Sequence, residues 1–104
     1  MELLKKGKKA IDCQNHSEIK NLYFQTQNRT RRINLYDVFL KLFFYACQKE
    51  RKDSIIFLMR MYMEYFSDTT KIALRQSFFY GKYKIKNASL RKWYSEYILP
   101  IIKG

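Results

Sequence analysis

The residue types that carry most metal and nucleophilic chemistry are rare in this chain, and a group of them lies between Asp12 and His16. Cys13 and His16 have the spacing of two zinc ligands, but a structural zinc site needs four, and Cys47 is the only remaining cysteine or histidine. A Cys–His nucleophilic pair would need an orienting carboxylate, for which Asp12 is the one neighbour, and an oxyanion-binding device that the sequence does not show. We therefore interpret Cys13 and His16 as surface-loop residues.

Other sequence signatures of catalysis are also missing. The glycines are isolated, so no glycine-rich loop that cradles phosphate is present. The carboxylates stand where helix caps and surface ion pairs use them, rather than as a pair placed for general acid–base work. We expect a protein that is not an enzyme, with no catalytic residue, no metal ligand and no cofactor.

Basic residues form the second chemically informative group. The chain has 21 Lys plus Arg against 9 Asp plus Glu, a formal net charge of +12. The excess lies at the two ends, since residues 1–32 carry +5, residues 33–68 carry no net charge and residues 69–104 carry +7. Such ends attract phosphate backbones, anionic lipid headgroups or acidic protein surfaces, and net charge does not separate these partners. The candidate contacts to phosphate or to an acidic partner are Arg29, Arg31, Arg32, Lys82, Lys84, Lys86, Arg91 and Lys92.

Aromatic residues are interleaved with the carboxyl-terminal basic set. Tyr80 precedes its lysines and Tyr83 lies among them, and Trp93 and Tyr94 follow its last two members. Basic residues alternating with aromatic ones can hold phosphates and stack unpaired bases, at about 1–3 kcal/mol per stacked base. The alternative is that Trp93 and Tyr94 face the core. We favour that alternative because one helical stripe contains Leu90, Trp93, Tyr94, Tyr97 and Ile98.

Hydrophobic periodicity predicts a central pair of helices. The first spans 35–51, with Asn34 as its N-cap residue. Its apolar face contains Val38, Phe39, Leu42, Phe43, Ala46 and Cys47. Asp53 or Ser54 caps the second helix, which is apolar on nearly all sides as far as Phe66 and is therefore expected at the centre of the domain. The short connection makes the two helices antiparallel neighbours.

A shorter helix and a linker are expected next. Cap residues at 67–70 lead into a helix over 71–80, which Gly81 would end as a C′ residue. Lysines alternate with apolar residues over 82–86, a pattern of extended backbone. Because no partner strand is evident, we expect this segment to be a linker.

The last helix is amphipathic. Asn87 or Ser89 provides its N-cap. Proline disfavours α geometry in the residue before it, so Pro100 should end regular helix near Ile98. The residues after Pro100 are expected to form a tail that folds back.

These elements fit one domain, because the 104 residues are 47% hydrophobic and 17% aromatic, enough for a helical core. We predict a small all-α domain of about four to five helices around the central antiparallel pair. The single domain, 1–104, comprises a basic part with a short helix (1–32), an apolar helical core (33–80), and a basic linker with the amphipathic last helix (81–104).

The cysteines and the hydropathy pattern favour a reducing compartment. The two cysteines are too few for a disulfide scaffold, and the first residues lack the apolar run of a secretory signal. No apolar run approaches the roughly 20 residues of a membrane span. We expect an intracellular protein, cytoplasmic or nuclear, with no transmembrane segment.

The amino end of the chain resembles the junction between two ankyrin repeats over residues 2–24. Residues 2–7 are similar to the end of a repeat's second helix, where a Leu-Leu pair precedes a glycine by two residues. Ile11-Asp12, Asn15 and Leu22-Tyr23 then follow in the family's spacing through the hairpin into the next first helix. The resemblance implies a worn terminal fragment of an ankyrin array, and such fragments imply protein–protein binding.

Two functions follow from these patterns. The leading expectation is a non-enzymatic protein–protein interaction module, such as a worn ankyrin-type helical fragment, with another protein as its partner. The alternative is a small basic nucleic-acid-binding protein that uses the Lys and Arg clusters at both ends. The sequence patterns specify neither the partner's identity nor the oligomeric state.

Overall fold

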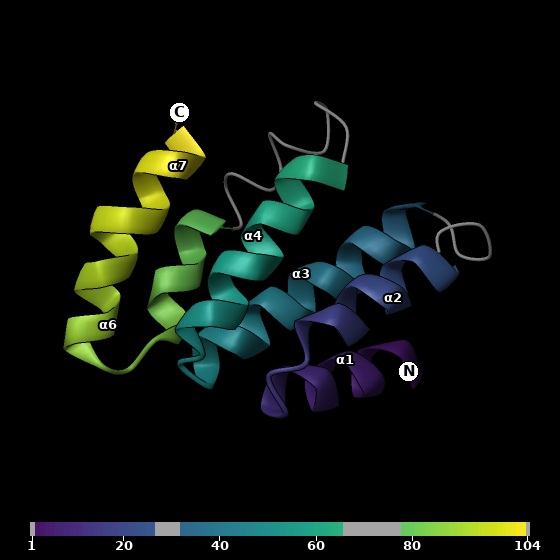
Figure 1. Ribbon diagram of the computed structural model, residues 1–104. Coiled ribbons are helices and arrows are strands. Elements are labelled where there is room, and N and C mark those ends of the chain that lie inside the picture. Colours follow the sequence, from purple (N-terminus) through teal and green to yellow (C-terminus); the bar gives the residue numbers. More distant parts are fainter. Residues whose placement is uncertain (1, 27–31, 66–77, 104) are drawn as a thin grey trace.

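The computed structural model describes residues 2–26, 32–65 and 78–103, and all regular structure in these ranges is helical (Figure 1). The predicted all-α class is therefore confirmed. In chain order the elements are α1 (Glu2–Asp12), α2 (His16–Thr26), α3 (Arg32–Gln48), α4 (Lys52–Tyr65), the 3-10 helix η1 (Lys82–Lys84), α6 (Ala88–Trp93), the π-helical turn η2 (Tyr94–Ile98) and α7 (Leu99–Lys103). Residues 78–81 are also helical and lead directly into η1.

Two helical hairpins make up the amino-terminal part, α1 with α2 and α3 with α4 (Figure 1). Two residues after the first helix of each hairpin ends, the chain takes the left-handed conformation, at Gln14 with φ 56° and at Glu50 with φ 57°. At the second turn the Glu50 N–H donates to the Cys47 carbonyl and the Arg51 N–H to the Ala46 carbonyl. This pattern, repeated after α1, is a Schellman motif without its usual glycine.

The predicted helix boundaries need several corrections. The helix expected over 35–51 spans Arg32–Gln48, so Asn34 lies inside its first turn and is not the cap. The next helix begins at Lys52, and Ser54 contacts His16 of α2 instead of capping. The expected helix over 71–80 lies outside the described residues except for its last three positions, which are helical.

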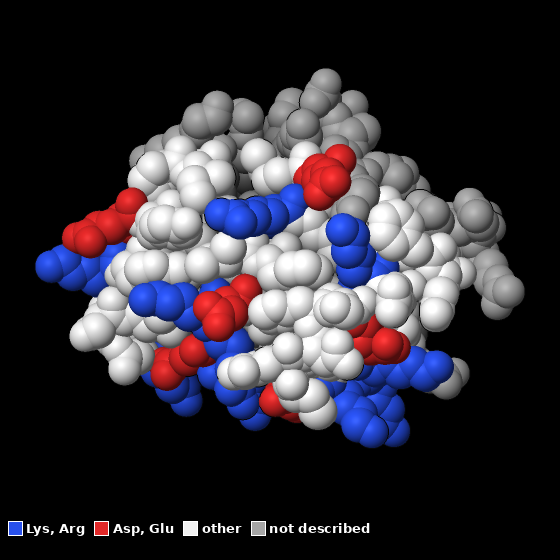
Figure 2. All heavy atoms as spheres, viewed as in Figure 1, with Lys and Arg blue, Asp and Glu red and all other residues white. Residues whose placement is uncertain are grey.

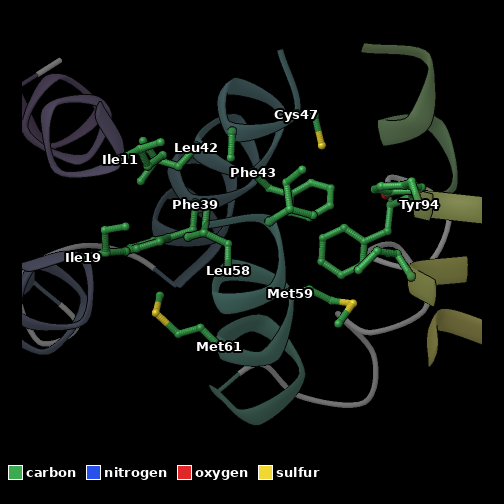
Figure 3. Close-up of a cluster of buried hydrophobic side chains, with 14 of the residues drawn as sticks. Ile11, Ile19, Phe39, Leu42, Phe43, Cys47, Leu58, Met59, Met61 and Tyr94 are labelled. Atoms are coloured by element: carbon green, nitrogen blue, oxygen red, sulfur yellow. The ribbon is translucent and has the colours of Figure 1, made fainter. Parts of the chain in front are cut away.

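The core is built around α3, as predicted from its periodicity (Figure 3). The six residues of the predicted apolar face are all buried, with relative exposures of 0–1%. Ile11 of α1 and Ile19 of α2 cover one side of α3, whereas Leu58 of α4 lies on another. Burying a side chain of this size contributes about 1.5–3 kcal/mol, so the hydrophobic effect is the main stabilising term.

The carboxyl-terminal segment covers the far end of this core. Phe43 of α3 lies 4.4 Å from Phe78 and 6.4 Å from Tyr94, centroid to centroid. The buried Tyr94 hydroxyl donates to the Phe78 carbonyl oxygen. Gly81 is not the predicted C′ residue, because its φ of −58° is right-handed. Its missing side chain lets the backbone approach, since a Cβ there would lie 2.6 Å from Tyr94 Oη.

The last helix passes through Pro100 instead of ending near Ile98. The turn before the proline is π-helical, with the Leu99 N–H donating to the Tyr94 carbonyl. Proline supplies no N–H, and its ring crowds the carbonyl four residues earlier. A wider turn of this kind relieves such crowding locally, which explains how the helix continues to Lys103.

Candidate nucleic-acid interface

Three large aromatic side chains are exposed on the segment that enters and forms η1. The exposed fractions are 39% for Phe79, 60% for Tyr80 and 64% for Tyr83. Tyr80 and Tyr83 are three residues apart in consecutive helical turns, and their ring centroids are 6.3 Å apart. The Lys82 ammonium lies 4.9 Å from the Phe79 centroid and 5.1 Å from the Tyr83 centroid. We call Phe79, Tyr80, Lys82 and Tyr83 the aromatic ledge.

A basic hollow adjoins the ledge through Tyr83. Its volume is about 410 Å³, and its lining consists of Gln48, Lys49, Tyr83, Lys84 and Lys86. We call this hollow the basic groove. Its lysines come from two segments far apart in the sequence, the turn after α3 and the residues in and after η1. No carboxylate lines it, and among the described residues none of its lysines is within ion-pair distance of a carboxylate.

Two of the groove lysines lie over aromatic rings, which leaves their positive charge in place. The Lys49 ammonium lies 5.6 Å from the Tyr45 ring centroid, and that of Lys84 lies 5.8 Å from the Phe44 centroid. Cation–π contacts at exposed sites contribute about 0.5–1 kcal/mol each and leave the positive charge in place. The groove therefore keeps its attraction for an anion.

Hydrogen bonds hold the backbone that carries the groove. The buried Ile85 presents its carbonyl oxygen to Arg91, whose Nε and Nη2 donate at 3.2 and 2.8 Å. The Asn87 N–H donates to Glu50 Oε1 at 2.8 Å. Asn87 Oδ1 accepts from the Leu90 N–H, so Asn87, and not Ser89, is the cap of the last helix. The expected extended linker over 82–86 is therefore wrong for residues 82–84, which form the 3-10 helix η1. Residues 85 and 86 lie outside regular structure, and Ile85 is extended.

The predicted basic residues have different surroundings. Lys82, Lys84 and Lys86 lie on the ledge and the groove. Arg91 donates to backbone, and Lys92 lies 4.0 Å from Glu96 in an exposed ion pair. Outside the described residues lie Arg29 and Arg31, whereas Arg32 is the first residue of α3 and its side chain is not described.

Trp93 and Tyr94, which the sequence placed together in the core, differ in burial. Tyr94 is fully buried, which confirms the core interpretation. Trp93 is half-buried and stacks on Tyr97 with centroids 5.7 Å apart and planes 14° apart. The Lys52 ammonium lies 4.7 Å from its ring, so Trp93 is a surface-edge residue away from the basic groove lining.

Lys49 is the functional candidate that the sequence reasoning missed. It follows the carboxyl end of α3 by one residue and stands in a charge-neutral part of the chain. Its only sequence signal is a basic residue at a helix end, which is common because it complements the helix dipole. The fold brings it to Lys84 and Lys86, which no local pattern indicates.

Basic and acidic side chains are mixed on the face of the molecule seen in Figure 2. Lys and Arg side chains lie across the middle of the view and along its lower edge, with Asp and Glu side chains between them. A second hollow of about 320 Å³ has Glu50 and Lys52 in its lining together with Trp93. The basic groove differs from it in having no acidic lining residue.

The residues that suggested metal or nucleophilic chemistry are separated in the structure. Cys13 is exposed in the turn after α1, whereas Cys47 is buried and burial raises its pKa to about 12. His16 is not a loop residue, because it opens α2, stacks on Phe57 at 4.8 Å and lies 3.0 Å from Ser54 Oγ through Nε2. Within the described ranges no three His, Cys, Asp or Glu residues come together as metal ligands would.

Comparisons of the chain with family models, with curated proteins and with solved structures gave no match. The ankyrin relationship therefore stays a prediction. One local feature of it differs from the structure, since α1 continues past Gly7 to Asp12 where the resemblance expects a helix end. Among the described helices, none has the length and apolar character needed to cross a membrane.

Proposed function

We propose that this protein is a non-enzymatic binding module and that it binds nucleic acid through the basic groove. The observation that supports the proposal is the convergence of Lys49, Lys84 and Lys86 on one hollow without a lining carboxylate. Gathering ammonium groups raises the electrostatic free energy of the folded state, and bound phosphates lower it. No catalytic group is required.

The test is a salt titration of fluorescence anisotropy with a labelled mixed-sequence oligonucleotide. A variant with Lys49→Gln, Lys84→Gln and Lys86→Gln should bind more weakly than the wild type at about 150 mM salt, where the screening length is about 8 Å. Each lost phosphate contact should reduce the slope of log K against log salt by about 0.7–0.9. These lysines line a surface hollow, so the variant should stay folded, and the two lost cation–π contacts should cost it no more than about 0.5–1 kcal/mol each.

A matched control separates the groove from net charge. Lys5, Lys9 and Lys20 are exposed on α1 and α2, and replacing all three by Gln removes the same number of charges. This control should bind almost as the wild type does. Equal loss of affinity in both triple variants, or no binding by the wild type at about 150 mM salt, would contradict the proposal.

A protein partner is the second candidate, as the sequence patterns and the ankyrin resemblance suggested. The exposed large apolar side chains outside the ledge favour it, namely Phe24 at 43%, Tyr97 at 42% and Ile101 at 39%. An apolar contact of this kind should depend weakly on salt, whereas a phosphate-driven complex weakens steeply. Salt-independent capture of one specific protein, which Phe24→Ser or Tyr97→Ser abolishes, is the expected result for this candidate.

A further inference from the structure

The aromatic ledge exposes more apolar ring surface than the core requires. Tyr80 and Tyr83 keep more than half of their surface in water, although Phe78, which precedes them, and Gly81, which lies between them, are buried. The planes of the two rings are tilted by 36° and their centroids are 6.3 Å apart, so the rings do not stack face to face on each other. More than half of each side chain therefore remains accessible to a planar ligand, with the Lys82 ammonium over the Tyr83 ring.

The ledge and the groove share Tyr83, which places an aromatic face directly beside ammonium groups. Tyr83 lines the groove with Lys84 and Lys86, and the Lys82 ammonium lies 5.1 Å from its ring. A ligand on this surface meets a flat apolar face and cationic groups within one residue of each other. Nucleotides combine these two properties, since each base is joined to a phosphate.

The supporting backbone is fixed before any ligand binds. Gly81 packs closely against Tyr94 and Phe43, and Ile85 is buried with its carbonyl held by Arg91. Tyr83 lies between these two anchors, and Tyr80 lies between Gly81 and the buried Phe78, so residues packed in the core flank both tyrosines. Preorganisation of this kind reduces the entropy loss on binding.

The geometry distinguishes single strands from duplexes. In a duplex the bases stack on one another, and a protein reaches only their edges in the grooves and the phosphates. In a single strand the base faces are accessible and stack on aromatic side chains. Exposed rings beside lysines can therefore stack on the bases of a single strand but not on those of a duplex.

We propose that the ledge and the groove bind single-stranded nucleic acid in preference to duplex, with a base stacked on Tyr83 and its flanking phosphates at Lys84 and Lys86. This inference rests on the proposed function, because it assigns the class of nucleic acid that the groove binds. Tyr80 provides a second stacking face three residues away. The lysines supply the salt-dependent part of the affinity and the tyrosines the preference for single strands.

The experiment compares three labelled probes at about 150 mM salt: a 20-nucleotide oligothymidine, a 20-base-pair duplex and a poly-glutamate peptide. The wild type should bind the single strand more tightly than the duplex or the peptide. The variant Tyr80→Leu, Tyr83→Leu should lose about tenfold or more in single-strand affinity, the equivalent of one to two stacked bases. Its duplex affinity and its salt slope should remain unchanged, and Tyr83→Phe should bind as the wild type does.

Each outcome separates this inference from the proposed function. Equal wild-type affinity for single strand and duplex, or a loss of less than about twofold in the double leucine variant, overturns the stacking inference while nucleic-acid binding stands. Equal binding of poly-glutamate overturns both, because the groove then responds to charge alone. Absence of binding to either nucleic acid also overturns both. Circular dichroism melts are the control for folding, and the double leucine variant should melt as the wild type does, because both tyrosines are exposed.

Discussion

Gly81 is the residue where the structure tolerates least change. Its backbone lies against the Tyr94 hydroxyl and the Phe43 ring, and a Cβ would approach Oη of the first to 2.6 Å and Cε1 of the second to 2.9 Å. Real Cβ atoms do not approach other atoms so closely, so one of the two rings has to move. Both rings are buried and Tyr94 is held by its hydrogen bond to Phe78. The glycine is therefore required by packing and not by its own backbone conformation.

Gly81→Ala should lower the free energy of unfolding by about 1–3 kcal/mol, the usual range for overpacking. Because the closest approach is to Tyr94 Oη, Tyr94→Phe should reduce the effect of the alanine, so the two changes should be less than additive. Urea denaturation of the single and double variants measures this coupling. Full additivity would show that the hydroxyl is not the obstacle.

Cys47 provides a pH-dependent prediction. Burial raises its pKa to about 12, against about 8.5 in an unfolded chain. The unfolded state therefore loses the proton first, so the stabilisation is complete below about pH 8.5 and is lost as the pH rises towards 12. Stability should fall by up to about 1.4 kcal/mol per pH unit from this thiol.

The measurement is urea denaturation between about pH 8 and 10 with reductant present. Cys47→Ala should have a shallower decline in this range than the wild type. The matched control is Cys13→Ala, which removes an exposed thiol and should leave the decline as it is. Identical slopes for the wild type and Cys47→Ala would contradict the assignment.

At the scale of elements, the segment 82–87 depends on hydrogen bonds from one nearby and one distant side chain. Its 3-10 turn is short, and the extended residues after it have no strand partner among the described residues. The Arg91 guanidinium and the Glu50 carboxylate satisfy two of its backbone groups. Arg91 is thus a positioning residue for the groove, although the sequence suggested a direct phosphate contact.

Arg91→Gln and Lys86→Gln should therefore differ, although each removes one positive charge. Loss of the charged hydrogen bonds to Ile85 should reduce the free energy of unfolding by about 1.5–3 kcal/mol for Arg91→Gln. Lys86→Gln should leave stability unchanged and reduce the salt slope of nucleic-acid binding. Thermal melts and the salt titration together measure both. If Arg91→Gln keeps its stability and reduces the salt slope, Arg91 contacts phosphate directly and is not a positioning residue.

At the scale of the whole molecule, one continuous hydrophobic core holds the fold. Phe43 joins α3 to the carboxyl-terminal segment through Phe78 and Tyr94. Both cysteines are free thiols, and the described residues contain no metal-ligand group. Stability should therefore depend on buried apolar area and not on cross-links.

Phe43→Ala should cost about 3–5 kcal/mol, a large part of the 5–15 kcal/mol typical of a domain. Phe57 is only half-buried beside His16, so Phe57→Ala should cost less and serves as the comparison. Chelator and reductant should leave the melting temperature of the wild type unchanged. A melt that responds to chelator while tolerating Phe43→Ala would reject this view of the fold.

Local patterns were sufficient for the helical class, for the buried face of α3 and for limiting the cap of the last helix to Asn87 or Ser89. These features depend on the spacing of apolar residues and on one side chain reaching its own backbone, and both are properties of neighbouring residues. The helix ends after Asp12 and Gln48 were missed or misplaced, because Gln14 and Glu50 take the left-handed position where a glycine would have been the signal. The predicted helix end near Ile98 was also wrong, because the π-helical turn before Pro100 accommodates the proline ring and the helix continues.

The sequence by itself determined that the chain is a basic helical domain with lysines and aromatic residues interleaved after Tyr80. Only the tertiary structure decided which of these residues share a surface. In the folded chain Tyr94 is buried, Arg91 donates to the Ile85 carbonyl, and Lys49 lines the same groove as Lys84 and Lys86. The physical reason is that periodicity reports which face of an element is apolar, whereas the approach of two elements depends on how their side chains pack together.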